Sequence, residues 1–271
     1  MKRWLKKYLV RKGWYTSLRY SFLFKGYQLL CKPEIAQAHR REVDFYHSFL
    51  ERTALVFDIG AYDGHKTEAF LTFSQAVVCC EPDKKNLEIL RARFKSKKKR
   101  VQIEPVAVSD TSGFLNYYVH HAGSAFNTIS PQWKALLESD QQEKWNETIR
   151  FSDIRRVEST TLDALIEKYG LPSFIKIDVE GAESRVLAGL SSAVESLSFE
   201  SLWPLYETQL EGCLQQLSEL DTNYRYNIAV DEKLVLPVFV SAGEILDHLR
   251  HSNITHLEII AKLNKLPQPT S

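Results

Sequence analysis

The sequence has few cysteines and no long apolar run. Its 271 residues include four cysteines, at positions 31, 79, 80 and 213, and no C-x-x-C pair. Neither a disulfide framework nor a cysteine zinc site is therefore indicated, and a reducing compartment is favoured. No segment reaches the roughly 18 apolar residues of a membrane span, and basic residues interrupt any signal-peptide core. We expect a cytoplasmic protein that neither crosses a bilayer nor is secreted by the usual route.

Acidic residues are absent from the first 33 residues. This segment holds nine of the 35 Lys and Arg residues, a charge of +9, interleaved with eight aromatic residues. If residues 2–12 form a helix, basic and apolar side chains fall on opposite faces, as in a helix lying at a membrane interface. We expect this segment to place the protein at the inner face of an anionic membrane. Packing on its own domain is the alternative, and RNA binding is less favoured.

The rest of the chain alternates short apolar runs with helical periodicity. A composition of 44% hydrophobic and 25% charged residues is typical of an ordered globular protein. The alternation predicts an α/β fold with a mostly parallel sheet covered on both faces. We expect a basic helical segment over residues 1–50 and one domain over 51–271, with a polar insertion at about 120–156. Strands are predicted at 54–59, 76–80, 101–108, 113–119, 173–179, 201–206, 224–230 and 234–240, and helices at 67–73, 84–94, 161–169, 182–190 and 208–220.

Two predicted strands end in motifs suited to a nucleoside. The first ends in Asp58-Ile59-Gly60-Ala61-Tyr62-Asp63-Gly64, where glycines allow a sharp turn and close approach to a ligand. The second ends in Glu81-Pro82, and a carboxylate there can accept hydrogen bonds from both ribose hydroxyls. The G-x-G-x-x-G dinucleotide fingerprint is incomplete, which disfavours a bound pyrophosphate. We take as cofactor-binding candidates Asp58, Gly60, Ala61, Gly64, Thr67, Glu81 and Pro82, with Ser109 and Asp110 beside the adenine.

The strand predicted at 173–179 carries charges where a central parallel strand is normally apolar. Its alternation puts Lys176, Asp178 and Glu180 on one side. Unpaired buried charges are costly, so we expect Lys176 and Asp178 to pair with each other or with a ligand. A purely structural ion pair is the alternative.

These motifs together resemble the FkbM family of S-adenosylmethionine-dependent methyltransferases. The resemblance rests on the first-strand motif, Glu81-Pro82, Ala107-Val108-Ser109-Asp110 and the string I-K-I-D-V-E-G-A-E at 175–183, and it covers residues 50–240. The family commonly has Asn where this chain has Tyr62. The resemblance implies a Rossmann-like class I methyltransferase sheet of seven strands, mostly parallel, with one antiparallel strand in an edge hairpin. It also implies S-adenosyl-L-methionine as cofactor and O-methylation, often of a sugar hydroxyl.

Within this expectation, the strand predicted at 173–179 and the residues that follow it supply the catalytic candidates. A protonated hydroxyl is a poor nucleophile, so we predict Asp178 as general base, Lys176 as its orienting or charge-balancing partner, and Glu180 as a contact for the acceptor. Asp178 as ligand of a divalent cation is the alternative. His65, His120 and His121 are weaker candidates for the base. A small molecule or a glycan, lipid-linked or membrane-proximal, is the expected acceptor.

Two other functions share the predicted sheet. An NAD-dependent oxidoreductase would use the same ribose contact but would prefer the missing third glycine. A non-catalytic membrane or RNA adaptor could retain the fold without the reaction. The sequence does not identify the acceptor or the oligomeric state.

Overall fold

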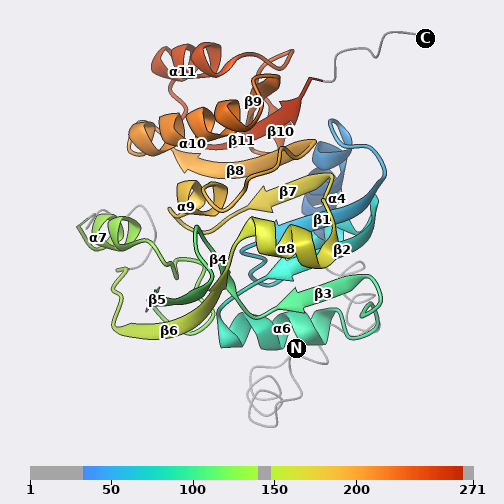
Figure 1. Cartoon of the computed structure of the whole chain (residues 1–271), viewed down its shortest axis with the longest axis vertical. Coiled ribbons are helices and arrows are strands. Elements are labelled where there is room, and N and C mark those ends of the chain that lie inside the picture. Colours follow the sequence, from blue (N-terminus) through green and yellow to red (C-terminus); the bar gives the residue numbers. More distant parts are fainter. Residues whose placement is uncertain (1–32, 140–147, 265–271) are drawn as a thin grey trace.

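A computed structural model describes residues 33–139 and 148–264 (Figure 1). The expectations for residues 1–32 lie outside this range. The described residues form an eight-stranded sheet with helices on both faces and a separate three-stranded sheet, so the predicted α/β class is confirmed. None of the helices within these two ranges is long and apolar enough to cross a membrane.

The central sheet has the order β10-β9-β11-β8-β7-β1-β2-β3. Five neighbouring strands, from β8 to β3, are parallel, whereas β11 is antiparallel to both β8 and β9, and β10 is antiparallel to β9. The chain moves outward from β1 in one direction and returns to add β7 on its other side, which makes the β1–β7 boundary the topological switch point. The strands are β1 (Thr53–Ile59), β2 (Ser74–Cys80), β3 (Val101–Glu104), β7 (Phe174–Ile177), β8 (Ser196–Leu202), β9 (Tyr224–Val230), β10 (Lys233–Leu234) and β11 (His256–Leu263).

Helices cover this sheet in two layers because its strands alternate two apolar faces. Val56 and Phe174 pack on one side, and Phe57 and Ile175 pack on the other. The first layer consists of α4 (Pro33–His47), α5 (His65–Phe70) and α6 (Lys84–Arg93). The second consists of α8 (Leu162–Tyr169), α9 (Glu183–Leu187), α10 (Glu207–Leu220) and α11 (Ala242–Arg250).

Helix α4 belongs to the folded domain, although its sequence falls in the expected N-terminal segment. Phe45 and Tyr46 are buried, and the Tyr46 ring lies 4.8 Å from that of Phe70 and 5.8 Å from that of Phe174. Edge-to-face aromatic contacts of this kind stabilise a core beyond the burial of area alone. Residues 33–50 therefore add a helix to the first layer.

A second sheet and α7 stand apart from the central layers (Figure 1). The sheet has the order β4-β6-β5, with strands β4 (Ala107–Val108), β5 (Gly113–Val119) and β6 (Asp153–Thr160). The predicted strand at 113–119 is confirmed. The prediction of one strand over 101–108 is wrong, because the chain leaves β3 at Pro105 and forms β4 in the other sheet. The polar insertion contains α7 (Pro131–Ser139).

The carboxyl-terminal part of the sheet differs most from the prediction. It has eight strands instead of seven, and two of them are reversed. The strand predicted at 201–206 is wrong, because β8 begins at Ser196, where buried serines alternate with Leu197 and Phe199. Neither α11 nor β11 was predicted. Strand β11 lies inside the sheet, between β8 and β9. Both of its faces are therefore covered, and Ile259 and Ile260, on opposite faces, are fully buried.

Candidate functional site

The loop after β1 uses left-handed backbone to turn into α5. Gly60 has φ +81°, and a Cβ atom there would lie 1.8 Å from the backbone oxygen of Asp178. Gly64 has φ +79°, and its Cβ would meet side chains of α6 at 2.6–2.7 Å. The predicted sharp turn is therefore present, but the need for these two glycines comes from packing inside the protein. Tyr62 has φ +49°, a conformation that Asn adopts more readily than an aromatic residue.

Glu81 fastens this loop to the end of β2. Its Oε2 accepts a hydrogen bond from the Tyr62 N–H at 2.9 Å, and its Oε1 accepts one from the Asp83 N–H at 2.7 Å. The side chain is almost completely buried, and burial raises its pKa to about 8. Each carboxylate oxygen retains a further lone pair for a ligand donor.

A small cavity of about 270 Å³ lies at the ends of β1, β2 and β7, beside the switch point. Part of the insertion, residues 124–129, forms its opposite wall. Its volume is close to the lower end of the range of about 300–1,000 Å³ for ligand pockets. Its wall includes seven of the predicted site residues, namely Asp58, Gly60, Ala61, Glu81, Pro82, Asp178 and Glu180.

Four predicted cofactor residues do not line the small cavity. Thr67 is fully buried and donates a hydrogen bond to Asp58, whose pKa burial raises to about 6. Ser109 is also fully buried and donates to Asp110 at 2.7 Å, and Asp110 pairs with Arg185. The fourth, Gly64, packs against α6 as described. In the segment expected beside the adenine, the apolar residues Ala107 and Val108 do line the cavity, together with Val106.

A buried charge network lies beside the small cavity. The fully buried Lys176 Nζ is 3.3 Å from Glu200 Oε1 and 3.7 Å from Asp178 Oδ2. Lys66 of α5 donates to Asp178 at 3.0 Å and to Glu200 at 2.9 Å. The expected pairing of Lys176 with Asp178 is present, but Lys66 makes the shorter contact. Lys176 does not line the small cavity or the large cleft described below, so its charge balances the carboxylates of Asp178 and Glu200 from inside the protein.

The network keeps Lys66 and Glu200 charged. Burial lowers the pKa of Lys66, but Asp178 and Glu200 raise it further, so it lies well above its ordinary value. Burial raises the pKa of Glu200, but Lys176 and Lys66 hold it well below its ordinary value. Sequence reasoning missed Lys66 and Glu200. Lys66 is a charged residue two positions after Gly64, but the sequence gives no indication of which residue pairs with it. Glu200 was missed because the strand was predicted at 201–206, which excludes it.

Glu180 lies on the small cavity in a strained backbone conformation. Its φ of +56° is uncommon for a residue with a side chain, and its backbone oxygen accepts a hydrogen bond from Thr128 Oγ1 at 2.7 Å. Burial and then the neighbouring Asp178 raise its pKa well above the ordinary value. Within the described ranges its carboxylate makes no hydrogen bond or ion pair. Strain and an unpaired carboxyl together are typical of a ligand-facing position.

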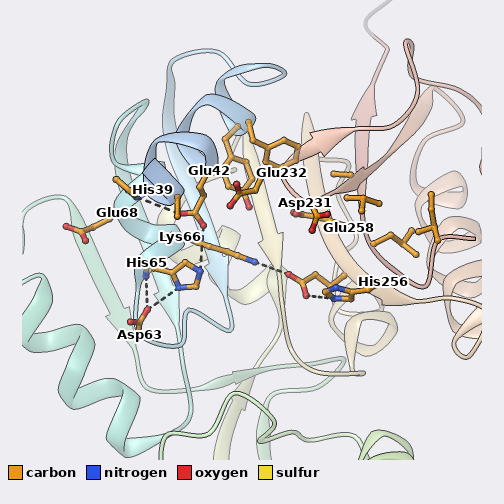
Figure 2. Close-up of a pocket in the computed structure, with 18 of the residues that line it drawn as sticks. His39, Glu42, Asp63, His65, Lys66, Glu68, Asp231, Glu232, His256 and Glu258 are labelled. Carbon is orange, nitrogen blue, oxygen red and sulfur yellow. Dashed lines mark hydrogen bonds and ion pairs between the residues drawn. The ribbon is translucent and has the colours of Figure 1, made fainter. Parts of the chain in front are cut away.

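A large cleft of about 1,020 Å³ adjoins the small cavity, and Figure 2 shows residues that line the cleft. Three residues, His65, Lys66 and Glu200, line both spaces. His65 pairs with Asp63 at 3.1 Å, whereas His120 and His121 line neither space. In the part of the chain that the structure describes, no group of three or more His, Cys, Asp or Glu residues could hold a metal ion. The alternative of a divalent cation at Asp178 therefore has no support.

The sequence profile of the methyltransferase FkbM domain matches residues 58–251. The chain belongs to the FkbM methyltransferase family. The resemblance seen in the sequence is thus confirmed, and the match includes every predicted site residue. A search among curated proteins finds no match. Residues 58–251 form an S-adenosylmethionine-dependent methyltransferase domain, and S-adenosyl-L-methionine is its expected cofactor.

The solved structures that resemble this chain include a member of the same family. A methyltransferase FkbM from Methylobacillus flagellatus KT is 14% identical, with a TM-score of 0.50 over 91% of this chain and 53% of that one. This FkbM chain therefore spans about half the length of that protein. A putative RNA methyltransferase from Pyrococcus horikoshii (11% identity, TM-score 0.39, 83% of each chain) is also similar. So is a precorrin-6y C5,15-methyltransferase from Geobacter metallireducens GS-15 (10% identity, TM-score 0.41, 84% of this chain and 87% of that one).

Proposed function

We propose that this protein binds S-adenosylmethionine in the small cavity and methylates a hydroxyl group, that of a sugar or glycan. The residues present fit the cofactor. Glu81 offers carboxylate lone pairs to a ribose diol, and Val106, Ala107 and Val108 offer an apolar surface to an adenine ring. Asn86 also lines the cavity, and its buried Oδ1 has no hydrogen-bond partner among the described residues. It could accept a hydrogen bond from an amino group.

The charge of the small cavity favours a sulfonium over a pyrophosphate. Asp58, Asp178 and Glu180 stand close to the Gly60 loop, where a Rossmann dinucleotide site places its phosphates. Carboxylates repel a pyrophosphate and attract a cation. This observation counts against an NAD-dependent oxidoreductase.

Asp178 carries the proposal, because it follows the end of β7, lies on the small cavity and accepts a hydrogen bond from Lys66, which lines both spaces. When bound, S-adenosylmethionine supplies a methyl group on an activated sulfonium. Asp178 would accept the proton of the acceptor hydroxyl as the hydroxyl oxygen bonds to the methyl carbon and the sulfur–methyl bond breaks, with S-adenosylhomocysteine as the leaving group. Lys66 fixes the Asp178 carboxylate through its 3.0 Å hydrogen bond, and residues 124–129 cover the cavity and exclude water.

The large cleft is the proposed acceptor site. It adjoins the small cavity at Lys66 and Glu200, and its wall is rich in carboxylates, which accept hydrogen bonds from hydroxyl groups. This chemistry supports a polyhydroxylated acceptor. We name no individual sugar, because the wall defines a class of ligand only.

Methyl transfer can be tested with isotope-labelled cofactor. The full chain is incubated with S-adenosyl-[methyl-¹³C]methionine and a panel of defined oligosaccharides, and products are analysed by mass spectrometry and NMR. A labelled methyl ether is expected. Labelled N-methyl or C-methyl products, or none with a protein that binds the cofactor, would contradict O-methylation of a sugar.

Membrane attachment through residues 1–33 is a further part of the proposal. The supporting observation is the charge of +9 with no acidic residue. Each basic residue near an anionic surface contributes about 1 kcal/mol, and salt screens the attraction. Co-sedimentation should show binding to vesicles with acidic lipid that falls as salt rises. Equal binding to neutral and acidic vesicles, or none, would contradict it.

A further inference from the structure

Tyr46 of α4 has a hydroxyl group that the protein leaves without a partner. The residue is 1% exposed and belongs to the wall of the large cleft. Its hydroxyl makes no hydrogen bond with any other described residue. A buried tyrosine usually has a hydrogen-bond partner for this group. The hydroxyl of Tyr46 therefore indicates a partner that binds in the cleft.

The ring of Tyr46 is held in place by its surroundings. It contacts four phenylalanine rings at centroid distances of 4.8 to 5.9 Å, namely those of Phe45, Phe49, Phe70 and Phe174. None of these contacts uses the hydroxyl, so a phenylalanine at position 46 would fill the same space in the core. A polar group at the end of a side chain that packing holds rigid is well suited to contact a ligand precisely.

The surroundings of this hydroxyl keep it neutral. Burial and then Glu258 raise the pKa of Tyr46 well above its ordinary value, although Lys66 lowers it. The protonated hydroxyl can both donate and accept hydrogen bonds. Lys66 and Glu258 lie in the cleft wall (Figure 2), and Asp58 of the small cavity also acts on the pKa of Tyr46. Tyr46 is therefore close to the boundary where the acceptor would meet the cofactor.

We infer that Tyr46 is a specificity-determining residue for the acceptor, and that its hydroxyl hydrogen-bonds a hydroxyl group of a sugar bound in the large cleft. This inference rests on the proposed function, which makes the cleft the acceptor site. A site built to bond a hydroxyl group discriminates against an analogue that lacks it, because the polar group of the site is then left unpaired. Helix α4 precedes residues 58–251, so this contact comes from a part of the chain outside the matched domain.

Tyr46→Phe is the direct test, because it removes one atom and keeps the four ring contacts. Methyl transfer from labelled S-adenosylmethionine is measured with each oligosaccharide of the panel that yields a labelled methyl ether. We expect kcat/KM for the oligosaccharide to fall about 3- to 10-fold, the effect of one neutral hydrogen bond, through a higher KM. The kcat and the affinity for the cofactor should stay within about twofold. An unchanged KM would overturn the inference, and would mean that the hydroxyl contacts solvent only.

Tyr224→Phe is the matched control. Tyr224 is also buried, but it lines neither space, and its hydroxyl accepts a hydrogen bond from the Val194 N–H at 2.9 Å and donates one to the Val194 oxygen at 2.7 Å. Its substitution should lower the unfolding midpoint and leave KM unchanged. Tyr46→Phe should not lower the midpoint, since no described protein group loses a partner. A lower midpoint with an unchanged KM would give Tyr46 a structural role and overturn the inference.

Deoxy analogues identify the hydroxyl group of the acceptor. Each analogue of the best acceptor lacks one hydroxyl group that is not methylated. One analogue should have a higher KM than the parent sugar with the wild type but the same KM as the parent with Tyr46→Phe, because the effects of two groups in contact are not additive. Additive losses for every analogue would overturn the inference.

Failure of this inference can be told apart from failure of the proposed function. The full chain is labelled with 3-fluorotyrosine, and the ¹⁹F signal of Tyr46 is assigned by its absence in Tyr46→Phe. An oligosaccharide that shifts this signal without being methylated contradicts the proposed function and leaves the inference standing. Methylation with an unchanged signal and an unchanged KM overturns the inference alone. No shift and no methylation with any oligosaccharide contradicts both.

Discussion

The small cavity and the large cleft lie side by side, but their walls are built differently along the chain. The small cavity takes its main groups from residues at strand ends, such as Gly60, Glu81 and Asp178, within short contiguous motifs. The large cleft joins Glu42 to Asp231 and Glu258, nearly 200 residues further along. The comparison teaches that the proposed cofactor site can be recognised from local sequence motifs. The proposed acceptor site cannot, because its residues come together only in the folded chain.

The two spaces also differ in how their charges are balanced. At their boundary, Lys66 neutralises Asp178 and Glu200 through hydrogen bonds of 3.0 and 2.9 Å. Farther into the cleft, Glu42 is paired with the histidines His39 and His65, at 3.7 and 3.6 Å, and not with a lysine or arginine among the described residues. We therefore expect substitutions at this boundary to lower the rate of methyl transfer. Substitutions in the small cavity should weaken binding of the cofactor alone, and those in the large cleft should weaken binding of the acceptor alone.

Asp178→Asn should give the largest effect. It removes the proposed proton acceptor while keeping side-chain size, so methyl transfer should fall by about 10² or more. S-adenosylmethionine affinity, measured by calorimetry, should change less than about threefold, since a neutral amide can keep the contact with Lys66. Asp110→Asn, which lies outside both spaces, is the control. Unchanged turnover would remove Asp178 from the mechanism, and recovery with added magnesium would revive the cation alternative.

Among these variants, Glu81→Ala should show the clearest difference between ligand binding in the small cavity and ligand binding in the large cleft. Loss of hydrogen bonds from a ribose diol to a carboxylate should cost roughly 2–4 kcal/mol, or tens- to hundreds-fold in cofactor affinity. Binding of an oligosaccharide that the protein methylates should stay within about twofold. Glu88→Gln on the exposed face of α6 serves as the control. Parallel weakening of both ligands in a folded variant would mean that the spaces are not independent.

Cofactor binding should depend on pH through Glu81. Its pKa of about 8 keeps the unliganded carboxyl largely protonated at pH 7. Hydroxyl donors stabilise the ionised form, so binding should release a proton. Affinity should therefore rise with pH up to about 8, by at most about tenfold per unit. Calorimetry in buffers of different ionisation enthalpy measures the release. Glu81→Gln should remove this dependence, and a dependence that persists in this variant would assign it to another group.

Tyr62→Asn should give the smallest effect, a gain in stability of about 1 kcal/mol. The reason is that Asn tolerates the left-handed conformation seen at φ +49°. The Tyr62 N–H bond to Glu81 is a backbone bond and should persist. Tyr62→Phe keeps the backbone cost and is the matched control, which should not show the gain expected of Tyr62→Asn. A lower unfolding midpoint for Tyr62→Asn would show that contacts of the aromatic ring stabilise the fold by more than the left-handed backbone at this position destabilises it.

The sequence predicted the first half of the sheet better than the second. Strands β1, β2 and β7 are apolar runs followed by a glycine or a charged residue. Such a pattern is visible in a short stretch of sequence. Strand β8 starts with alternating serines, and β11 pairs with strands from two other places in the chain. Their positions depend on burial between neighbours, which no local pattern records.

The same distinction applies to the site residues. Glu81 and Asp178 were predicted because each ends a strand, and strand ends meet at one edge of the sheet. Ser109 and Asp110 were placed beside the adenine on the same reasoning, but β4 belongs to the second sheet, and Asp110 pairs with Arg185. Lys66 was missed because its role depends on Glu200, which lies 134 residues away.

The most direct test of this account is equilibrium binding of S-adenosylmethionine and NAD to the full chain and to Glu81→Ala. The account predicts that S-adenosylmethionine binds, that NAD binds at least tenfold more weakly, and that Glu81→Ala loses most of the S-adenosylmethionine affinity. Tighter binding of NAD, or no binding of S-adenosylmethionine by the folded protein, would contradict it.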